Sequence, residues 1–293
     1  MKYQRWRALF LMLLMTGCNN HASVIATVTL FPAETNTSIP PNETASPTTT
    51  SVPLIEGVCS PLQGIALGDL WLITSNVYVF KYPFSEGSPN EKNHPGIDLG
   101  FYSTENIPSY SGQELHTDDG FPIQAILAGK VVETVNNRFP YGNMLLIETR
   151  VDALTPEFQT QLNLPEPYSR DVLDFRFPCD KDQPSISWSQ DSKSIYVLYA
   201  HMKDPSTLGP GDQVQCGQVI GGIGATGNSS ENIEHLHLEI RIGPSDAKLG
   251  NIANYDAVAT TEERYNYCIW ALSQEFQPVD PAIFWETGPH RYQ

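Results

Sequence analysis

The sequence predicts an all-β fold, an antiparallel β-sandwich or open barrel with long loop insertions and a short C-terminal helix. From about residue 54 to the C-terminus, short apolar runs are separated by Gly, Pro, Asn and Asp, which is typical of strands joined by turns. No long helical periodicity competes with these runs. The chain has 293 residues, of which 40% are hydrophobic, so it can bury a core of this kind. The expected strands are residues 70–73, 77–80, 97–101, 123–127, 130–135, 144–149, 195–201, 213–215, 219–223 and 235–242.

The first eighteen residues are typical of an export signal. Three basic residues precede an apolar run at residues 8–15, which is too short to span a bilayer as a mature helix. The run leads into Leu-Met-Thr-Gly-Cys at residues 14–18, which resembles the lipobox of bacterial lipoproteins, where cleavage precedes a cysteine that then carries lipid. We therefore expect an extracytoplasmic protein that Cys18 anchors to the bacterial cell membrane. A plain secretory peptide with an accidental cysteine is the alternative.

Residues 19–53 are dominated by Thr, Ser, Pro, Asn and Ala. Such a segment cannot bury enough apolar surface to offset the entropy lost on ordering, so we expect a disordered linker before a folded domain at residues 54–293. The linker would let a tethered domain explore the nearby cell wall.

The chain is acidic, with 33 Asp and Glu residues against 17 Lys and Arg residues and a net charge of -16. Binding to nucleic-acid phosphates needs a basic surface. The composition therefore argues against nucleic acid as a partner.

Four further cysteines, Cys59, Cys179, Cys216 and Cys268, form an even set in an oxidising compartment. Two disulfides are expected, with three possible connectivities, and we favour Cys59 with Cys268 and Cys179 with Cys216. A cysteine-ligated metal site is disfavoured because no two of these residues have a CxxC-type spacing.

Three segments depart from the strand pattern. Residues 261–273 predict a helix, because Thr261 could cap it and Tyr265 and Ile269 recur at helical spacing. Residues 102–120 and 151–193 are long insertions, which are uncommon in compact domains unless they have a role. They could form the walls of a substrate groove or simply stiffen the surface.

Four of the seven histidines lie in three short motifs. In the first, His94-Pro-Gly-Ile-Asp98, a turn precedes a strand, so the His94 and Asp98 side chains could converge on one ion, although this spacing is common by chance. In the second, His201 ends an apolar strand and is expected on the face of Val197 and Tyr199. A rigid sheet often presents catalytic groups at strand ends.

The third motif, His235-Leu-His-Leu-Glu-Ile-Arg-Ile, alternates strictly. Its apolar residues are expected to face the core, while His235, His237, Glu239 and Arg241 share the opposite face. Two imidazoles would therefore project side by side into a cleft or solvent. Glu239 could support a ligand imidazole, but we expect an exposed glutamate on the strand surface.

This set of residues suits hydrolytic zinc chemistry. A catalytic zinc ion takes three nitrogen or carboxylate ligands and keeps a fourth position open. One carboxylate and two imidazoles meet this need, and the two remaining histidines could exchange protons or stabilise an oxyanion. The spacing alone leaves open which two of the four histidines bind metal.

The three motifs together resemble the lysostaphin-type, or LytM-like, family of peptidoglycan zinc endopeptidases. The family pattern is HxGxD, a strand ending in YxH, and a Gly-rich hairpin leading into HLH, and all three occur here in this order. Residues 211–227 are similar to the family's GDxVxxGQxIGxxGxTG run. Gly129–Val132 and Val279–Pro281 resemble its early strand and closing segment, so the resemblance covers about residues 87–285.

The resemblance implies an antiparallel β fold of the duplicated-hybrid-motif type with a substrate groove. It implies zinc ligation by His94, Asp98 and His237, and catalysis by His201 and His235. The implied function is a zinc metalloendopeptidase that hydrolyses peptidoglycan stem peptides or cross-bridges. The alternative is an inactive family member that binds the wall or activates another hydrolase. A cupin-like barrel also uses HxH, but the order of the other metal-type residues disfavours it.

Overall fold

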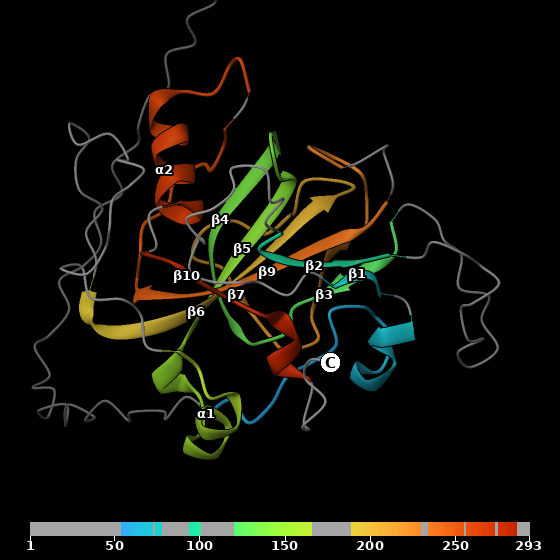
Figure 1. Ribbon diagram of the computed structural model, residues 1–293, viewed down its shortest axis with the longest axis vertical. Helices are drawn as coiled ribbons and strands as arrows, with labels where there is room; N and C mark the ends of the chain where they lie inside the picture. The colour runs from blue at the N-terminus through green and yellow to red at the C-terminus, as the bar shows by residue number, and fades with distance from the viewer. Residues whose placement is uncertain are drawn as a thin grey trace, which may run out of the picture. The chain divides into compact units, whose positions relative to one another are not determined.

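An antiparallel sheet of eight strands forms the centre of the computed structural model (Figure 1). The strand order is β1-β2-β9-β6-β5-β4-β7, and β10 pairs with β9. The strands are β1 (Thr74–Val77), β2 (Gly96–Leu99), β4 (Gly129–Arg138), β5 (Gly142–Arg150), β6 (Ser189–Met202), β7 (Gln213–Val214), β9 (Leu236–Ser245) and β10 (Gln277–Val279). A second sheet pairs β3 (Pro122–Gln124) with β8 (Val219–Gly222). The predicted all-β, antiparallel fold is confirmed.

The structure describes residues 54–72, 74–77, 94–100, 120–165, 189–229, 234–254, 256–272 and 275–285. The expected signal segment 1–18 with Cys18, the linker 19–53, Cys179 and residues 102–119 of the first insertion lie outside this set. Within the described residues, no helix is long and apolar enough to cross a membrane.

The central sheet buries side chains on both faces, because the strands alternate as expected. On β9, Leu236, Leu238, Ile240 and Ile242 belong to one core cluster, which also packs against β3 and β8 through Ile123 and Ile220. The other face of the sheet packs against a second cluster built around Trp270 and Phe276. Tyr196, Leu198 and Ala200 of β6 belong to this second cluster. On β9, His237, Glu239 and Arg241 lie opposite these three residues and therefore share the face that packs against the second cluster.

The described helices lie at the edges of the strand framework. They are α1 (Pro156–Leu162), α2 (Thr261–Ala271) and the short 3-10 helices η1 (Leu67–Leu72), η3 (Val151–Ala153) and η6 (Pro281–Phe284). In α2, the Thr260 side chain accepts from the Glu263 N–H and the Glu263 carboxylate accepts from the Thr260 N–H, so Thr260 rather than Thr261 is the cap. Ile269 and Trp270 of α2 are buried in the second cluster.

Several element boundaries differ from those expected. The apolar run at 70–72 lies in the 3-10 helix η1, and β1 begins after it, because a short apolar run does not distinguish a helix from a strand. The insertion at 151–193 is not structureless, since it contains η3, α1 and the first residues of β6. The Thr155 hydroxyl accepts from the Phe158 N–H and Pro156 follows it, a helix start that the sequence analysis missed.

The favoured disulfide pairing is wrong. Cys59 is bonded to Cys216, with Cα atoms 5.6 Å apart, so neither Cys59–Cys268 nor Cys179–Cys216 forms. The observed bond ties the segment before η1 to the turn between β7 and β8. Cys268 is also disulfide-bonded. Sequence spacing does not encode which cysteines meet in space.

Candidate active site

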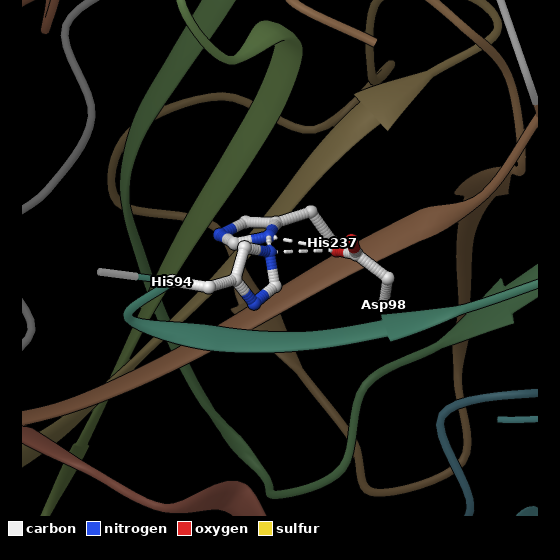
Figure 2. A group of neighbouring side chains, drawn as sticks. All are labelled: His94, Asp98 and His237. Carbon is white, nitrogen blue, oxygen red and sulfur yellow. Dashed lines mark hydrogen bonds and ion pairs between the residues drawn. The ribbon is translucent and has the colours of Figure 1, made fainter. Parts of the chain in front are cut away.

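His94, Asp98 and His237 meet at the paired strands β2 and β9 (Figure 2). Asp98 and His237 are direct partners in the β2–β9 register, and His94 lies on the turn just before β2. His237 Nδ1 is 2.9 Å from His94 Nε2 and 3.0 Å from Asp98 Oδ1, and the His94 Nε2–Asp98 Oδ1 distance is 3.0 Å. Three possible ligand atoms therefore form a nearly equilateral triangle.

The backbone brings the two strands very close at this point. A Cβ atom on Gly96 would lie 2.4 Å from the Leu238 carbonyl oxygen, so β2 could not pair with β9 in this way if residue 96 had a side chain. The motif glycine thus allows the approach that places Asp98 beside His237.

The orientation of each imidazole is set by its second nitrogen. His94 Nδ1 donates to the Gly96 carbonyl oxygen at 2.9 Å, so Nε2 is the nitrogen that faces Asp98 and His237. His237 Nε2 lies 3.6 Å from Glu239 Oε2, while its Nδ1 faces Asp98 and His94. Each atom of the triangle can offer a lone pair once the protons shared with Asp98 are displaced.

The charges in the triangle are strongly coupled. Burial acts to raise the pKa of Asp98, but hydrogen bonds from His237 and His94 hold it well below its usual range. Burial acts to lower the pKa of His237, but Asp98 and Glu239 raise it to about 9. A site that holds a proton this firmly between a carboxylate and two imidazoles offers the same atoms to a divalent cation.

The triangle also has the right size for zinc. Ligand atoms of a tetrahedral zinc ion with bonds of about 2.05 Å lie about 3.3 Å apart. The observed separations of 2.9 to 3.0 Å are slightly shorter, and small side-chain rotations would close the difference. The residues present therefore fit a zinc ion.

His201 and His235 lie next to the triangle. Their rings are 4.7 Å apart, the His201 ring is 5.8 Å from that of His237, and His235 Nε2 is 3.7 Å from Asp98 Oδ1. His201 Nδ1 donates to the Thr226 carbonyl oxygen at 2.7 Å. Burial lowers the pKa of His201 to about 3, and charge on His237 and His235 lowers it too. At neutral pH His201 is therefore uncharged, with Nε2 as its unprotonated nitrogen.

A bulge in β6 determines where His201 points. Tyr199 and Met202 both belong to the first core cluster, although they are three residues apart, and the β5–β6 register shifts between Asn143 and Leu145. His201 adopts a left-handed conformation with φ of 58° in this stretch. The expectation that His201 shares the face of Val197 and Tyr199 is therefore wrong, because the bulge turns its side chain towards His237.

The structure brings all five predicted site residues together, but it corrects the prediction for Glu239. This glutamate is fully buried rather than exposed, because α2 and the segment 275–279 cover that face of β9. Tyr141, which donates to Glu239, and Thr226, which holds His201, were missed. Thr226 lies in the Thr-Gly that ends the family-like run, whereas no sequence signal singles out Tyr141.

The site is open on the side of His94 and Asp98. Their side chains are 21% and 17% exposed, against 9% for His235 and 7% for His237.

A cavity of about 600 Å³ lies beyond the end of β6 that carries His201, and Lys203, Gly120 and Gly222 are among its lining residues.

Residues 186–249 match the model of Peptidase family M23. This segment includes His201, His235 and His237, and the family resemblance indicated by these motifs is confirmed there; His94 and Asp98 lie outside the matched residues. No curated protein matches the chain.

The chain also matches solved structures at low identity and with TM-scores below 0.5, among them the following three. The SpoIIQ–SpoIIIAH pore forming complex is 17% identical, with 64% of this chain and 84% of that chain covered and a TM-score of 0.33. A mutant catalytic domain of the prophage-encoded M23 protein EnpA from Enterococcus faecalis is 19% identical, with 60% and 85% covered and a TM-score of 0.31. The catalytic domain of lysostaphin from Staphylococcus simulans is 21% identical, with 59% and 84% covered and a TM-score of 0.31.

Proposed function

From the Peptidase family M23 segment that this chain carries, we propose that it is a zinc-dependent metalloendopeptidase that hydrolyses peptide bonds in peptidoglycan stem peptides or cross-bridges. The observation that carries the proposal is the convergence of His94 Nε2, Asp98 Oδ1 and His237 Nδ1 within 3.0 Å of one another. Two imidazoles and one carboxylate on β9, on β2 and just before β2, with two more histidines beside them, suit metal-assisted hydrolysis.

In this proposal His94, Asp98 and His237 hold the metal. A zinc ion held by them would supply a Lewis acid that polarises the scissile carbonyl and lowers the pKa of water. His201 accepts through Nε2 a proton from the water that attacks the scissile carbonyl carbon, because burial keeps its ring neutral and Thr226 fixes Nδ1 as the protonated nitrogen. The proton then passes to the leaving amine. His235, 3.7 Å from the Asp98 carboxylate, is placed to donate a hydrogen bond to the carbonyl oxygen as negative charge develops there.

We also propose that the protein acts outside the cytoplasm, lipid-anchored at Cys18 to the bacterial cell membrane. The apolar run, the Leu-Met-Thr-Gly-Cys segment and the polar stretch at 19–53 support this location. An anchored enzyme would find its substrate in the adjacent wall.

The test is digestion of purified peptidoglycan by the full protein, with product fragments identified by mass spectrometry. Zinc-loaded wild type should release new peptide ends, and the chelator-treated protein should release none. His237→Ala should lose both metal and cleavage, whereas His201→Ala should keep the metal and lose cleavage. Unchanged wall fragments from zinc-loaded wild type would instead favour a wall-binding protein without activity, and equal zinc content in wild type and His237→Ala would overturn the ligand assignment.

A further inference from the structure

A buried ion pair continues the row of side chains that begins with His235, just before β9, and His237 on β9. Glu239 is 0% exposed and Arg241 is 3% exposed, and the Arg241 guanidinium contacts Glu239 Oε1 through both Nε and a terminal nitrogen. A buried charge pair of this kind contributes little net stability compared with apolar residues of similar size. Because Glu239 lies next to the proposed metal ligand His237, we consider a role for the ion pair at the metal site.

The second carboxylate oxygen of Glu239 faces the site. Oε2 accepts from the Tyr141 hydroxyl at 3.1 Å and lies 3.6 Å from His237 Nε2. Both Glu239 oxygens face donors, since the Arg241 guanidinium contacts Oε1 and the Tyr141 hydroxyl donates to Oε2, so the group is a carboxylate. A carboxylate can only accept, so the His237 nitrogen that faces it is the protonated one.

Arg241 is held in turn by the C-terminal part of the domain. One terminal nitrogen donates to the Phe276 carbonyl oxygen at 2.9 Å, and the guanidinium carbon lies 5.0 Å from the centre of the Trp270 ring. The Phe276 ring packs directly on Gly243 of β9, where a Cβ atom would lie 2.6 Å from it. The position of Glu239 is therefore fixed from α2 and from the segment that leads into β10.

We propose that Glu239 is a positioning residue that fixes His237 as the Nε2-protonated tautomer and so presents Nδ1 to the metal, with Arg241 and Tyr141 holding the carboxylate in place. This inference deepens the proposed function and rests on it. The carboxylate prevents rotation of the imidazole and increases its basicity, as partners of metal-bound histidines commonly do. The C-terminal segments thereby support the metal site without contacting the metal.

The test measures zinc affinity by competition with a chromophoric chelator, using the full protein and zinc alone. Glu239→Gln should weaken zinc binding about 10- to 100-fold, the usual effect of removing such a partner. Tyr141→Phe removes one hydrogen bond to Glu239 Oε2 and should give a smaller loss. Because Glu239→Gln leaves the Arg241 charge buried without its partner, the variant could fail to fold. The double variant Glu239→Gln/Arg241→Met removes both charges, so it should fold, by circular dichroism, and still bind zinc weakly.

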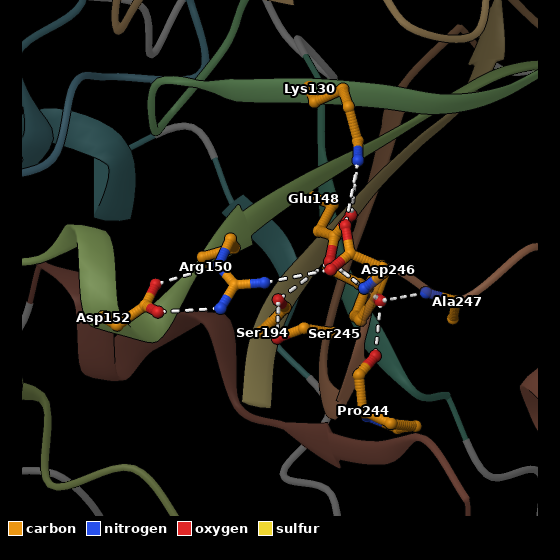
Figure 3. Close-up of polar contacts among 10 residues, drawn as sticks. Lys130, Glu148, Arg150, Asp152, Ser194, Pro244, Ser245, Asp246 and Ala247 are labelled. Carbon is orange, nitrogen blue, oxygen red and sulfur yellow. Dashed lines mark hydrogen bonds and ion pairs between the residues drawn. The ribbon is translucent and has the colours of Figure 1, made fainter. Parts of the chain in front are cut away.

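Glu148 on β5 provides the matched control (Figure 3). It is an equally buried carboxylate, 3% exposed, that accepts from the Ser194 and Tyr196 hydroxyls and the Asp246 N–H, outside the site. Glu148→Gln should lower stability and leave zinc affinity unchanged. If wild type binds zinc and the double variant binds it equally well, the positioning role is wrong while the proposed function stands. If wild type binds no zinc, the proposed function itself fails.

Discussion

Replacing His201 by Asn should make the metal-free protein less sensitive to acid. The folded-state pKa of His201 is lowered to about 3, mainly by burial, whereas an unfolded histidine has a pKa of about 6.5. Between these values only the unfolded chain binds the proton, so stability falls as the pH falls. Above about pH 6.5 the histidine does not lower the free energy of unfolding. Below that pH the free energy of unfolding decreases steadily until the pH approaches 3.

The magnitude follows from the two pKa values. Going from pH 7 to pH 5, protonation of His201 in the unfolded chain should destabilise the folded state by about 2 kcal/mol. Asn does not titrate, tolerates the left-handed φ of 58°, and can donate its amide N–H to the Thr226 carbonyl in place of Nδ1. The variant thus removes the titration while it keeps the local structure.

The assay is urea unfolding of both proteins at pH 7, 6 and 5 in the presence of a chelator. Wild type should lose about 2 kcal/mol more free energy of unfolding than His201→Asn between pH 7 and pH 5. The other titrating groups contribute to both proteins and largely cancel in the difference. Parallel pH profiles would show that the pKa of His201 is the same in the folded and unfolded chains, and that burial does not keep its ring neutral below pH 6.5.

Three further predictions concern the framework and the anchor. Gly142→Ala should destabilise the domain by about 2–4 kcal/mol in urea unfolding, because φ is 69° and the new Cβ would lie 2.4 Å from the Thr226 carbonyl carbon, whereas Gly209→Ala, with open space around it, should have little effect. Cys59→Ser should cost about 3–5 kcal/mol in the same assay, since the bond spans a sequence separation of 157 residues, and an unchanged midpoint under oxidising conditions would contradict this. Cys18→Ser should move the protein from the washed membrane fraction to the soluble fraction; continued sedimentation would exclude the lipid anchor.

Local pattern was sufficient to predict much of the fold, whereas the group of site residues was implied by the family resemblance of the three motifs. The strict alternation from His235 to Ile242 predicted that His235 and His237 share one face, and the His-Pro-Gly-Ile-Asp segment indicated that His94 and Asp98 could converge, as the structure shows they do. Both predictions concern neighbours along one strand or turn, where side-chain direction follows directly from sequence spacing.

The errors concern features that depend on distant parts of the chain. Side chains on a strand alternate between its two faces, but this alternation fails at His201. The register of β6 shifts next to this left-handed residue, and no residue type in the sequence indicates the bulge. Glu239 is buried by helix α2 and the segment around Phe276, which lie more than twenty residues further along the chain. The Cys59–Cys216 pairing likewise depends on how the folded chain brings two remote loops together.

The Cys59–Cys216 bond also determines how the domain would bear mechanical load. A force applied to the chain from the N-terminal side would first act on Ile55. This residue forms two backbone hydrogen bonds of 2.9 Å, one to Ala153 and one to Thr155. Once these bonds yield, tension passes at Cys59 through a covalent link to the turn between β7 and β8. The strand β2, with its motif residues, lies within the closed loop and outside the path of the force. If the proposed anchor at Cys18 holds the domain, such a pull would leave β2 paired with β9, where Asp98 lies beside His237.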